Sequence, residues 1–233
     1  MGVDNDQDSS TTLSTELTPA EQFWTQLHRG KGRFGLVGAL VLIWLLHTLL
    51  TRHLVHGGYI TTQLQLFDNL ELLGTFLFVV SSLLIIYAIL ADKLDKFSKV
   101  IAVYLAYAVF QVVLNVISML GTANAHQGGG LTSLWDVGLV YLMSVLVFTF
   151  VYIFIDVSTP GGAFVWPARE GEKPPTPNFL DYLFVSMNVN STYGPTNEAM
   201  MSRVGKLVMA FQVLLAVSML TVLIARAVAS TSS

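Results

Sequence analysis

Cysteine is absent from this chain of 233 residues, and charged side chains are scarce, at 12% of the residues. A protein without cysteine has no disulfide, no thiolate nucleophile and no thiolate-bound metal. The formal net charge is only -3 and no basic run interleaves with aromatic residues, so we do not expect a nucleic acid as partner. Hydrophobic residues make up 53% of the chain, more than in a typical soluble domain. This composition predicts an integral membrane protein.

The motifs of common enzymes are also missing. The chain has no Gly-x-Ser-x-Gly, no His-Glu-x-x-His and no phosphate-binding glycine loop, and none of its apolar runs holds paired carboxylates. His53 and His56 have a spacing that suits one metal, but no third ligand stands beside them. We therefore expect no enzymatic activity, no metal and no cofactor.

Five apolar runs are long enough to cross about 30 Å of hydrocarbon. They cover residues 34–51, 72–90, 100–120, 137–155 and 207–225. Lipid cannot hydrogen-bond the backbone, and the runs are too uniformly apolar for barrel strands, so each run is predicted to be helical. The fold class expected is an all-α membrane protein with about five transmembrane helices, located in the cell's inner (plasma) membrane and in contact with its lipid bilayer.

The remaining segments divide the chain into parts. Residues 1–18 are rich in Asp, Ser and Thr, which is typical of a disordered tail. Residues 19–33 are expected to form either an interfacial helix, with Trp24 at the headgroup level, or an ordinary lead-in to the first span. Residues 34–120 would form a scaffold of three spans, and residues 137–228 a second module.

The second module contains an apolar stretch that is too short to cross the membrane. The segment 158–178, before this stretch, contains five of the seven prolines and is expected to be neither helix nor central strand. The stretch itself, from Phe179 to Met187, covers only about 13 Å as a helix. The polar segment from Asn188 to Pro195 follows. Such a half-helix and polar turn at membrane depth must face water or other protein.

The region from Gly161 to Ala227 resembles the pore-loop potassium-channel superfamily, in particular its small bacterial members. The likeness rests on Gly-Gly-Ala-Phe at 161–164, on the half-helix Leu-Asp-Tyr-Leu-Phe-Val-Ser at 180–186, on Tyr193-Gly194, and on the end of the last helix at 222–228. It covers about 65 residues. The Gly-Gly and Phe-x-Trp-Pro loop and the Phe-Leu-Asp-Tyr half-helix are also similar to an uncharacterised family of small bacterial multi-pass membrane proteins.

The resemblance implies an outer helix, a half-helix, a filter loop and an inner helix, arranged as a homotetramer around a path for monovalent cations, K⁺ or Na⁺. The residues that it implies for the filter and pore lining are Asn188, Asn190, Ser191, Thr192, Tyr193 and Gly194. Asn190, Ser191 and Thr192 stand where the family has Thr, Val and Gly, so potassium selectivity is not implied. Hydrogen bonding to neighbouring helices is the alternative role of this polar cluster.

Asp181 is expected to cap the half-helix or to line the rim of the pore. The chain is thus expected to be an oligomeric cation channel. Two alternatives are a non-conducting membrane protein that uses the same fold for assembly or partner binding, and a small secondary transporter. The distribution of Lys and Arg predicts that the half-helix enters the membrane from the cytoplasmic side, whereas in the pore-loop family it enters from the outer side. We expect the family's orientation.

Overall fold

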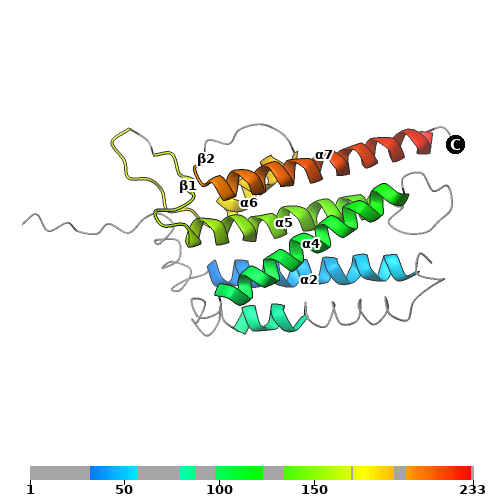
Figure 1. Ribbon diagram of the computed structural model, residues 1–233, viewed down its shortest axis with the longest axis horizontal. Helices are drawn as coiled ribbons and strands as arrows, with labels where there is room; N and C mark the ends of the chain where they lie inside the picture. Colours follow the sequence, from blue (N-terminus) through cyan, green and yellow to red (C-terminus); the bar gives the residue numbers. More distant parts are fainter. Residues whose placement is uncertain are drawn as a thin grey trace, which may run out of the picture.

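The computed structural model describes residues 32–56, 79–87, 98–122, 134–168, 170–191 and 198–231. Its helices are α2 (Gly32–His56), α4 (Ser98–Thr122), α5 (Leu134–Ser158), α6 (Phe179–Ser191) and α7 (Arg203–Thr231), and residues 79–87 are also helical. Two strands of two residues, β1 (Phe164–Val165) and β2 (Ala199–Met200), form an antiparallel pair. The long helices lie side by side, and the short α6 lies beside α5 and α7 at one end (Figure 1).

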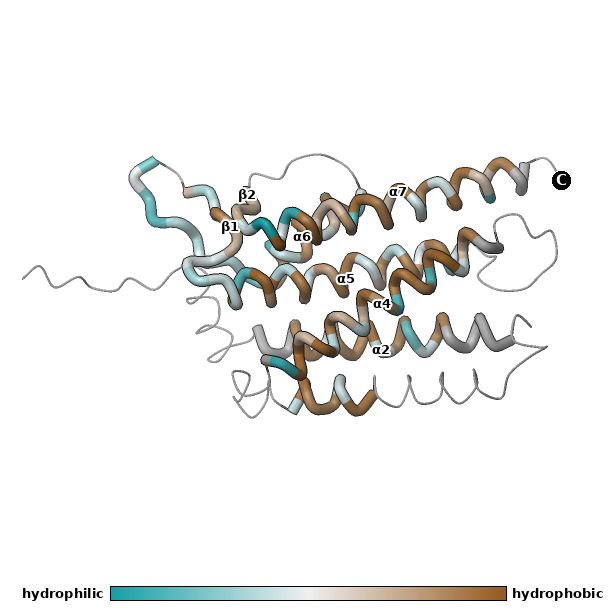
Figure 2. Tube along the Cα trace, viewed as in Figure 1, coloured by the Kyte–Doolittle hydropathy of each residue, from teal (hydrophilic) through white to brown (hydrophobic). Residues whose placement is uncertain are grey.

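Among the described residues, three helices have the length and composition to cross a membrane, and they cover Lys99–Leu120, Trp135–Ser158 and Arg203–Val228. Within α2, the apolar part is shorter, Leu36–Leu50. Apolar residues line these helices, and the polar residues gather in the loop before α6 (Figure 2). A helical protein with long apolar helices is thereby confirmed. The number of five spans stays a prediction, because only residues 79–87 of the run 72–90 are described.

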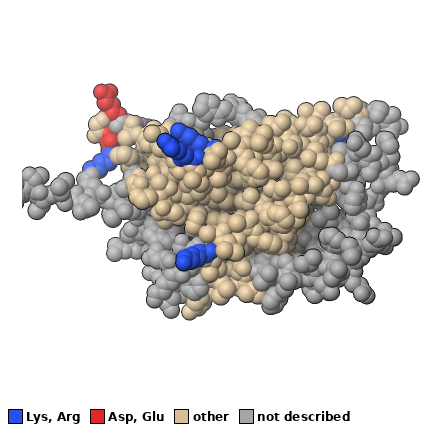
Figure 3. All heavy atoms as spheres, in the orientation of Figure 1, with Lys and Arg blue, Asp and Glu red and all other residues tan. Residues whose placement is uncertain are grey.

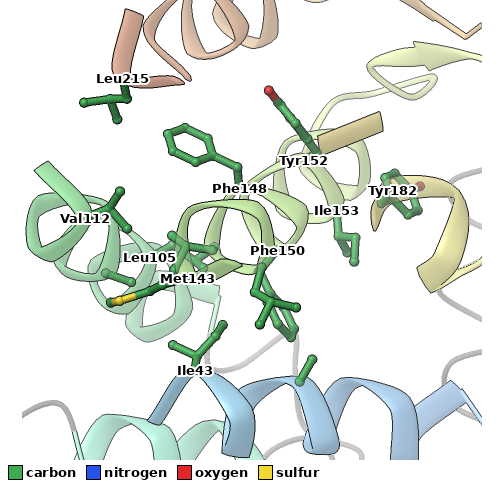
Figure 4. Packing of buried hydrophobic residues seen from close by; sticks show 14 of the residues in the cluster. Ile43, Leu105, Val112, Met143, Phe148, Phe150, Tyr152, Ile153, Tyr182 and Leu215 are labelled. Carbon is green, nitrogen blue, oxygen red and sulfur yellow. The ribbon is translucent and has the colours of Figure 1, made fainter. Parts of the chain in front are cut away.

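The fold is organised around α5. In its apolar stretch 61% of the residues are buried, against 33% in α4 and 28% in α7. It contacts α2, α4, α6 and α7. Figure 4 shows its side chains Met143, Phe148 and Ile153 pointing to different neighbours, with Ile43 of α2 and Leu215 of α7 on opposite sides. Because α5 is buried on nearly all sides, polar groups on it must find protein partners.

The chain between α5 and α7 leaves one end of the bundle and returns to it. The strand β1 follows α5 and β2 precedes α7, and their pairing places Phe164 opposite Met200. The positive φ angles of Gly161 and Gly162, 82° and 84°, allow the turn that joins α5 to β1. After Ser158, which ends α5, the described residues up to 178 contain no helix and only the two-residue strand β1, as predicted from the prolines of this segment.

The half-helix α6 is longer than predicted. It covers 13 residues instead of nine and ends at Ser191. Asn188, Asn190 and Ser191 are therefore part of the helix, and the prediction that a non-helical turn begins at Asn188 is wrong. At about 20 Å, α6 is still too short to cross the bilayer. The tail 1–18, the linker from 19 to 31 and residues 192–197 lie outside the described residues.

Candidate functional site: a half-helix held by buried polar contacts

The first turn of α6 is closed by Asn178 and Asp181. The Asn178 side-chain oxygen accepts hydrogen bonds from the backbone N–H of Leu180 (2.7 Å) and of Asp181 (3.3 Å). In return, the Asp181 carboxylate accepts one from the backbone N–H of Asn178, at 2.7 Å. This reciprocal arrangement is a capping box, and it satisfies amides that have no partner within the helix. The capping box explains why α6 begins at Phe179. Within it, Asp181 makes the backbone contact that is typical of a helix cap.

Asp156, near the end of α5, binds both the following loop and α6. One carboxylate oxygen accepts hydrogen bonds from the backbone N–H groups of Ala163 and Phe164, at 2.5 and 2.9 Å. The other accepts one from the hydroxyl of Tyr182, at 2.6 Å. Asp156, Ala163 and Tyr182 are all fully buried. A buried carboxylate is costly without such donors, so these hydrogen bonds hold the loop and α6 in position against the end of α5.

An aromatic cluster surrounds the Asp156 contacts. The Tyr182 ring lies edge-on to Phe164 and Trp166, with centroids 5.9 and 5.2 Å away, and Tyr152 lies edge-on to Phe164 at 5.9 Å. Such edge-to-face contacts are favourable beyond the area that they bury. The β1 strand is thereby fixed between α5 and α6.

A second set of polar contacts lies deeper, where α5, α6 and α7 meet. Gln212 of α7 accepts a hydrogen bond from the Tyr152 hydroxyl (2.5 Å) and donates from its amide nitrogen toward Ser186. Ser186 donates to the carbonyl of Val145 (2.8 Å), and Ser144 donates to the side-chain oxygen of Asn190 (3.2 Å). The five polar side chains are at most 3% exposed; they are Ser144, Tyr152, Ser186, Asn190 and Gln212.

This deeper set lies near the middle of the apolar layer. Ser144 is about 21 Å along α5 from its end at Ser158, and Gln212 is about 14 Å along α7 from its start at Arg203. Both helix ends lie at the end of the bundle from which α6 enters. The C-terminal turn of α6 is therefore held about halfway along the bundle by side-chain hydrogen bonds to α5 and α7.

The predicted pore-lining residues have different surroundings. Asn190 is buried, and its side-chain oxygen accepts a hydrogen bond from Ser144 of α5. This contact corresponds to the alternative role of the cluster, which is hydrogen bonding to a neighbouring helix. Its amide nitrogen is buried without a hydrogen-bond partner within the described part of the chain. Asn188 is half-buried, and its carbonyl accepts a hydrogen bond from the exposed Ser191 at 3.2 Å. Thr192, Tyr193 and Gly194 lie outside the described residues.

Polar side chains elsewhere in the bundle also have protein partners. The Gln111 amide donates to the Tyr107 hydroxyl of the same helix, at 2.6 Å, and Asn115 reaches the sulfur of Met143 at 3.8 Å. At the far end, Arg226 donates to the carbonyl of Met119 (3.4 Å), so it joins α7 to the end of α4. Among the described residues, no group of three or more His, Asp or Glu side chains is placed to hold a metal ion.

Sequence reasoning missed the residues that hold α6 in place. Asp156 and Tyr182 fix its beginning, and Ser186 and Gln212 fix its end. A signal was present, because Gln212 is the one Gln, Asn or charged residue within the apolar run 207–225. A polar residue inside a span is rare and has a partner there. The identity of that partner depends on the fold and not on local sequence.

Comparison with known proteins adds no relatives. No family model, no curated protein and no solved structure matches this chain. The case for a function therefore rests on the geometry of α5, α6 and α7.

Proposed function

We propose that the protein is an oligomeric cation-conducting membrane pore, in which α5 is the outer helix, α6 the half-helix and α7 the inner helix. The observation that supports this proposal is that α6 enters from one end of the bundle and stops at half depth. Backbone that leaves a helix at this depth has to be surrounded by protein or water. A path for ions is the arrangement that supplies water there.

Electrostatics favour a cation. The C-terminal end of a helix carries about half a negative elementary charge, because its last carbonyls have no partner within the helix. In α6 this end lies among apolar helices, where such a partial charge is screened weakly. A monovalent cation, K⁺ or Na⁺, would be stabilised near it.

Assembly is required, because one chain contributes one half-helix. The side of α6 that faces away from α5 and α7 is apolar and exposed, with Leu180, Phe184 and Met187 at 66%, 54% and 49%. A second copy packed on this side would cover these side chains. We infer a ring of copies, and a homotetramer is the arrangement that the resemblance to pore-loop channels implies.

The first test is cation flux from liposomes. Purified protein should release K⁺ or Na⁺ faster than empty liposomes, and both Asn190→Ala and Tyr193→Ala should change the rate or the K⁺ to Na⁺ ratio. Equal flux in the three proteins would remove these residues from the path. Absence of flux from well-folded wild type would refute the pore.

The second test uses the absence of cysteine from the chain. The exposed Ser191 ends α6, and a charged thiol reagent should modify Ser191→Cys if water reaches this depth. Leu214→Cys is the matched control, because Leu214 is 67% exposed at a similar depth on α7. If Ser191→Cys reacts no faster than Leu214→Cys, the end of α6 is not in water.

One observation favours a second candidate, a non-conducting membrane protein that uses the half-helix for assembly. Asn190 is buried and bonded to α5 instead of being exposed on α6. A fully folded oligomer without flux, in which Ser191→Cys resists the reagent, would establish this alternative.

A further inference from the structure

The amide nitrogen of Gln212 has more acceptors than hydrogens. It lies 3.1 Å from the carbonyl oxygen of Ser186, 3.1 Å from the Ser186 hydroxyl and 3.4 Å from the side-chain oxygen of Asn190. A side-chain amide has two N–H groups, so these three acceptors compete for two hydrogens. Ser186 and Asn190 are also one helical turn apart on α6.

The other end of the Gln212 amide is fixed. Its oxygen accepts the hydrogen bond of Tyr152, which belongs to α5. All of Gln212 is buried between α5, α6 and α7. An amide in such surroundings is costly to leave unpaired, so α7 is restrained to positions in which Gln212 still finds acceptors on α6. Two acceptor sets separated by one turn provide two such positions.

We propose that Gln212 is a positioning residue that sets the depth of the half-helix relative to α7. In the described arrangement it is bonded mainly to Ser186. A displacement of α7 along α6 would transfer its N–H groups to the side-chain oxygen of Asn190, which lies 3.4 Å from the Gln212 nitrogen in the described arrangement. Because packed helices shift between discrete arrangements, this transfer would change the depth of α6 relative to α7 by a defined step.

This inference names the regulation of the proposed pore and to that extent rests on the proposed function. The positioning role of Gln212 does not depend on conduction. Gln212, and not apolar packing alone, decides where the end of α6 lies.

The test measures the distance between the two helices. Spin labels are attached at Ser191→Cys and Lys206→Cys, both exposed positions, in the cysteine-free chain reconstituted with an excess of unlabelled protein. Gln212→Leu should raise the ratio of displaced to undisplaced molecules at least about fivefold, the effect of losing one net hydrogen bond. Gln212→Asn should raise the same ratio, because its shorter side chain no longer reaches the acceptors on α6. This variant replaces Gln212→Leu in the test if Gln212→Leu does not assemble.

Gln111→Leu is the matched control. It also removes a glutamine amide from an apolar helix, but the hydrogen bond of Gln111 to Tyr107 lies within α4. An unchanged distance distribution in both Gln212 variants would overturn the inference, and so would an equal change in Gln111→Leu. The same proteins are then tested for flux. If the distance shifts while wild type carries no flux, the positioning role stands and the proposed pore fails.

Discussion

The two halves of the described bundle are held together in different ways. Around α6, buried side chains of α5 and α7 make hydrogen bonds such as Asp156 to Tyr182 (2.6 Å) and Tyr152 to Gln212 (2.5 Å). Between the helices before α5 and their neighbours, the polar contacts are longer, with Ser82 to Tyr104 at 3.4 Å and Asn115 to Met143 at 3.8 Å. Apolar side chains of these helices, among them Leu40, Ile43 and Val112, belong to the buried core.

The difference shows where position matters. Lipid chains are as apolar as the helices, so apolar packing gives only a weak preference for one arrangement. Hydrogen bonds between buried groups are directional and fix one arrangement. Directional hydrogen bonds of this kind set the position of the half-helix α6. This agrees with a role for α6 that depends on its position relative to α5 and α7.

The substitution Asp156→Ala should have the largest effect on the hydrogen-bonded half of the bundle. The substitution leaves the N–H groups of Ala163 and Phe164 and the Tyr182 hydroxyl without their acceptor, and we expect a loss of about 3 kcal/mol or more of unfolding free energy. Titration with a denaturing detergent measures it. Asp156→Asn keeps one acceptor oxygen and should lose less. A variant Asp156→Ala as stable as wild type would contradict the role given to this carboxylate.

Two tyrosines compare the halves directly. Tyr182→Phe removes a short hydrogen bond to a buried carboxylate and should cost about 2 kcal/mol. Tyr104→Phe removes a contact of 3.4 Å between two hydroxyls and should cost less than about 1 kcal/mol. Both rings stay in place, so packing is unchanged. Equal losses in the same detergent titration would show that the halves do not differ.

The cap of α6 should have a smaller effect. Asn178→Ala removes the acceptor of the Leu180 and Asp181 amides, and N-cap losses of this kind cost about 1 kcal/mol. Asn178→Asp retains an acceptor oxygen and is the control. Hydrogen exchange of the first turn of α6 should rise in Asn178→Ala only. If the two variants exchange alike, the side chain of Asn178 does not cap the helix.

The smallest effects come from two glycines, one in each half. A Cβ at Gly205 would collide with the side chain of Met200, whereas a Cβ at Gly38 would meet nothing within 4 Å. The better helix propensity of alanine should therefore stabilise Gly38→Ala by about 0.5 kcal/mol, while displacement of Met200 offsets it in Gly205→Ala and leaves a net loss of about 0.5 kcal/mol. The opposite signs are checked by thermal unfolding in detergent. Changes of the same sign in both proteins would contradict the packing of Met200 on α7.

Local sequence was sufficient for the apolar helices and for the start of α6, because length, hydropathy and an N-cap act over a few residues. It was insufficient for the end of α6. Asn188, Asn190 and Ser191 have modest helix propensity, and the prediction ended the helix before them. In the structure, the Asn190 side chain bonds to Ser144, and Gln212 lies beside it. These partners lie 46 and 22 residues away in sequence, so no local pattern reveals them.

The charges at the two ends of the bundle have a consequence for sidedness. The helices α4 and α7 begin, and α5 ends, at the end where α6 enters (Figure 1). Lys99, Arg203 and Lys206 belong to these helix starts and Lys173 to the adjoining loop, whereas Arg226 lies near the opposite end. Figure 3 shows Lys and Arg gathered mainly toward the first end. Basic residues at helix ends favour the cytoplasm.

This distribution favours the orientation opposite to the one expected from the resemblance to pore-loop channels. The half-helix would open to the cell interior, so an impermeant thiol reagent should reach Ser191→Cys in inverted vesicles and not in intact cells. A blocker or regulator acting on this mouth would then have to be an intracellular molecule, and the far end of α7, near Arg226, would face the extracellular medium.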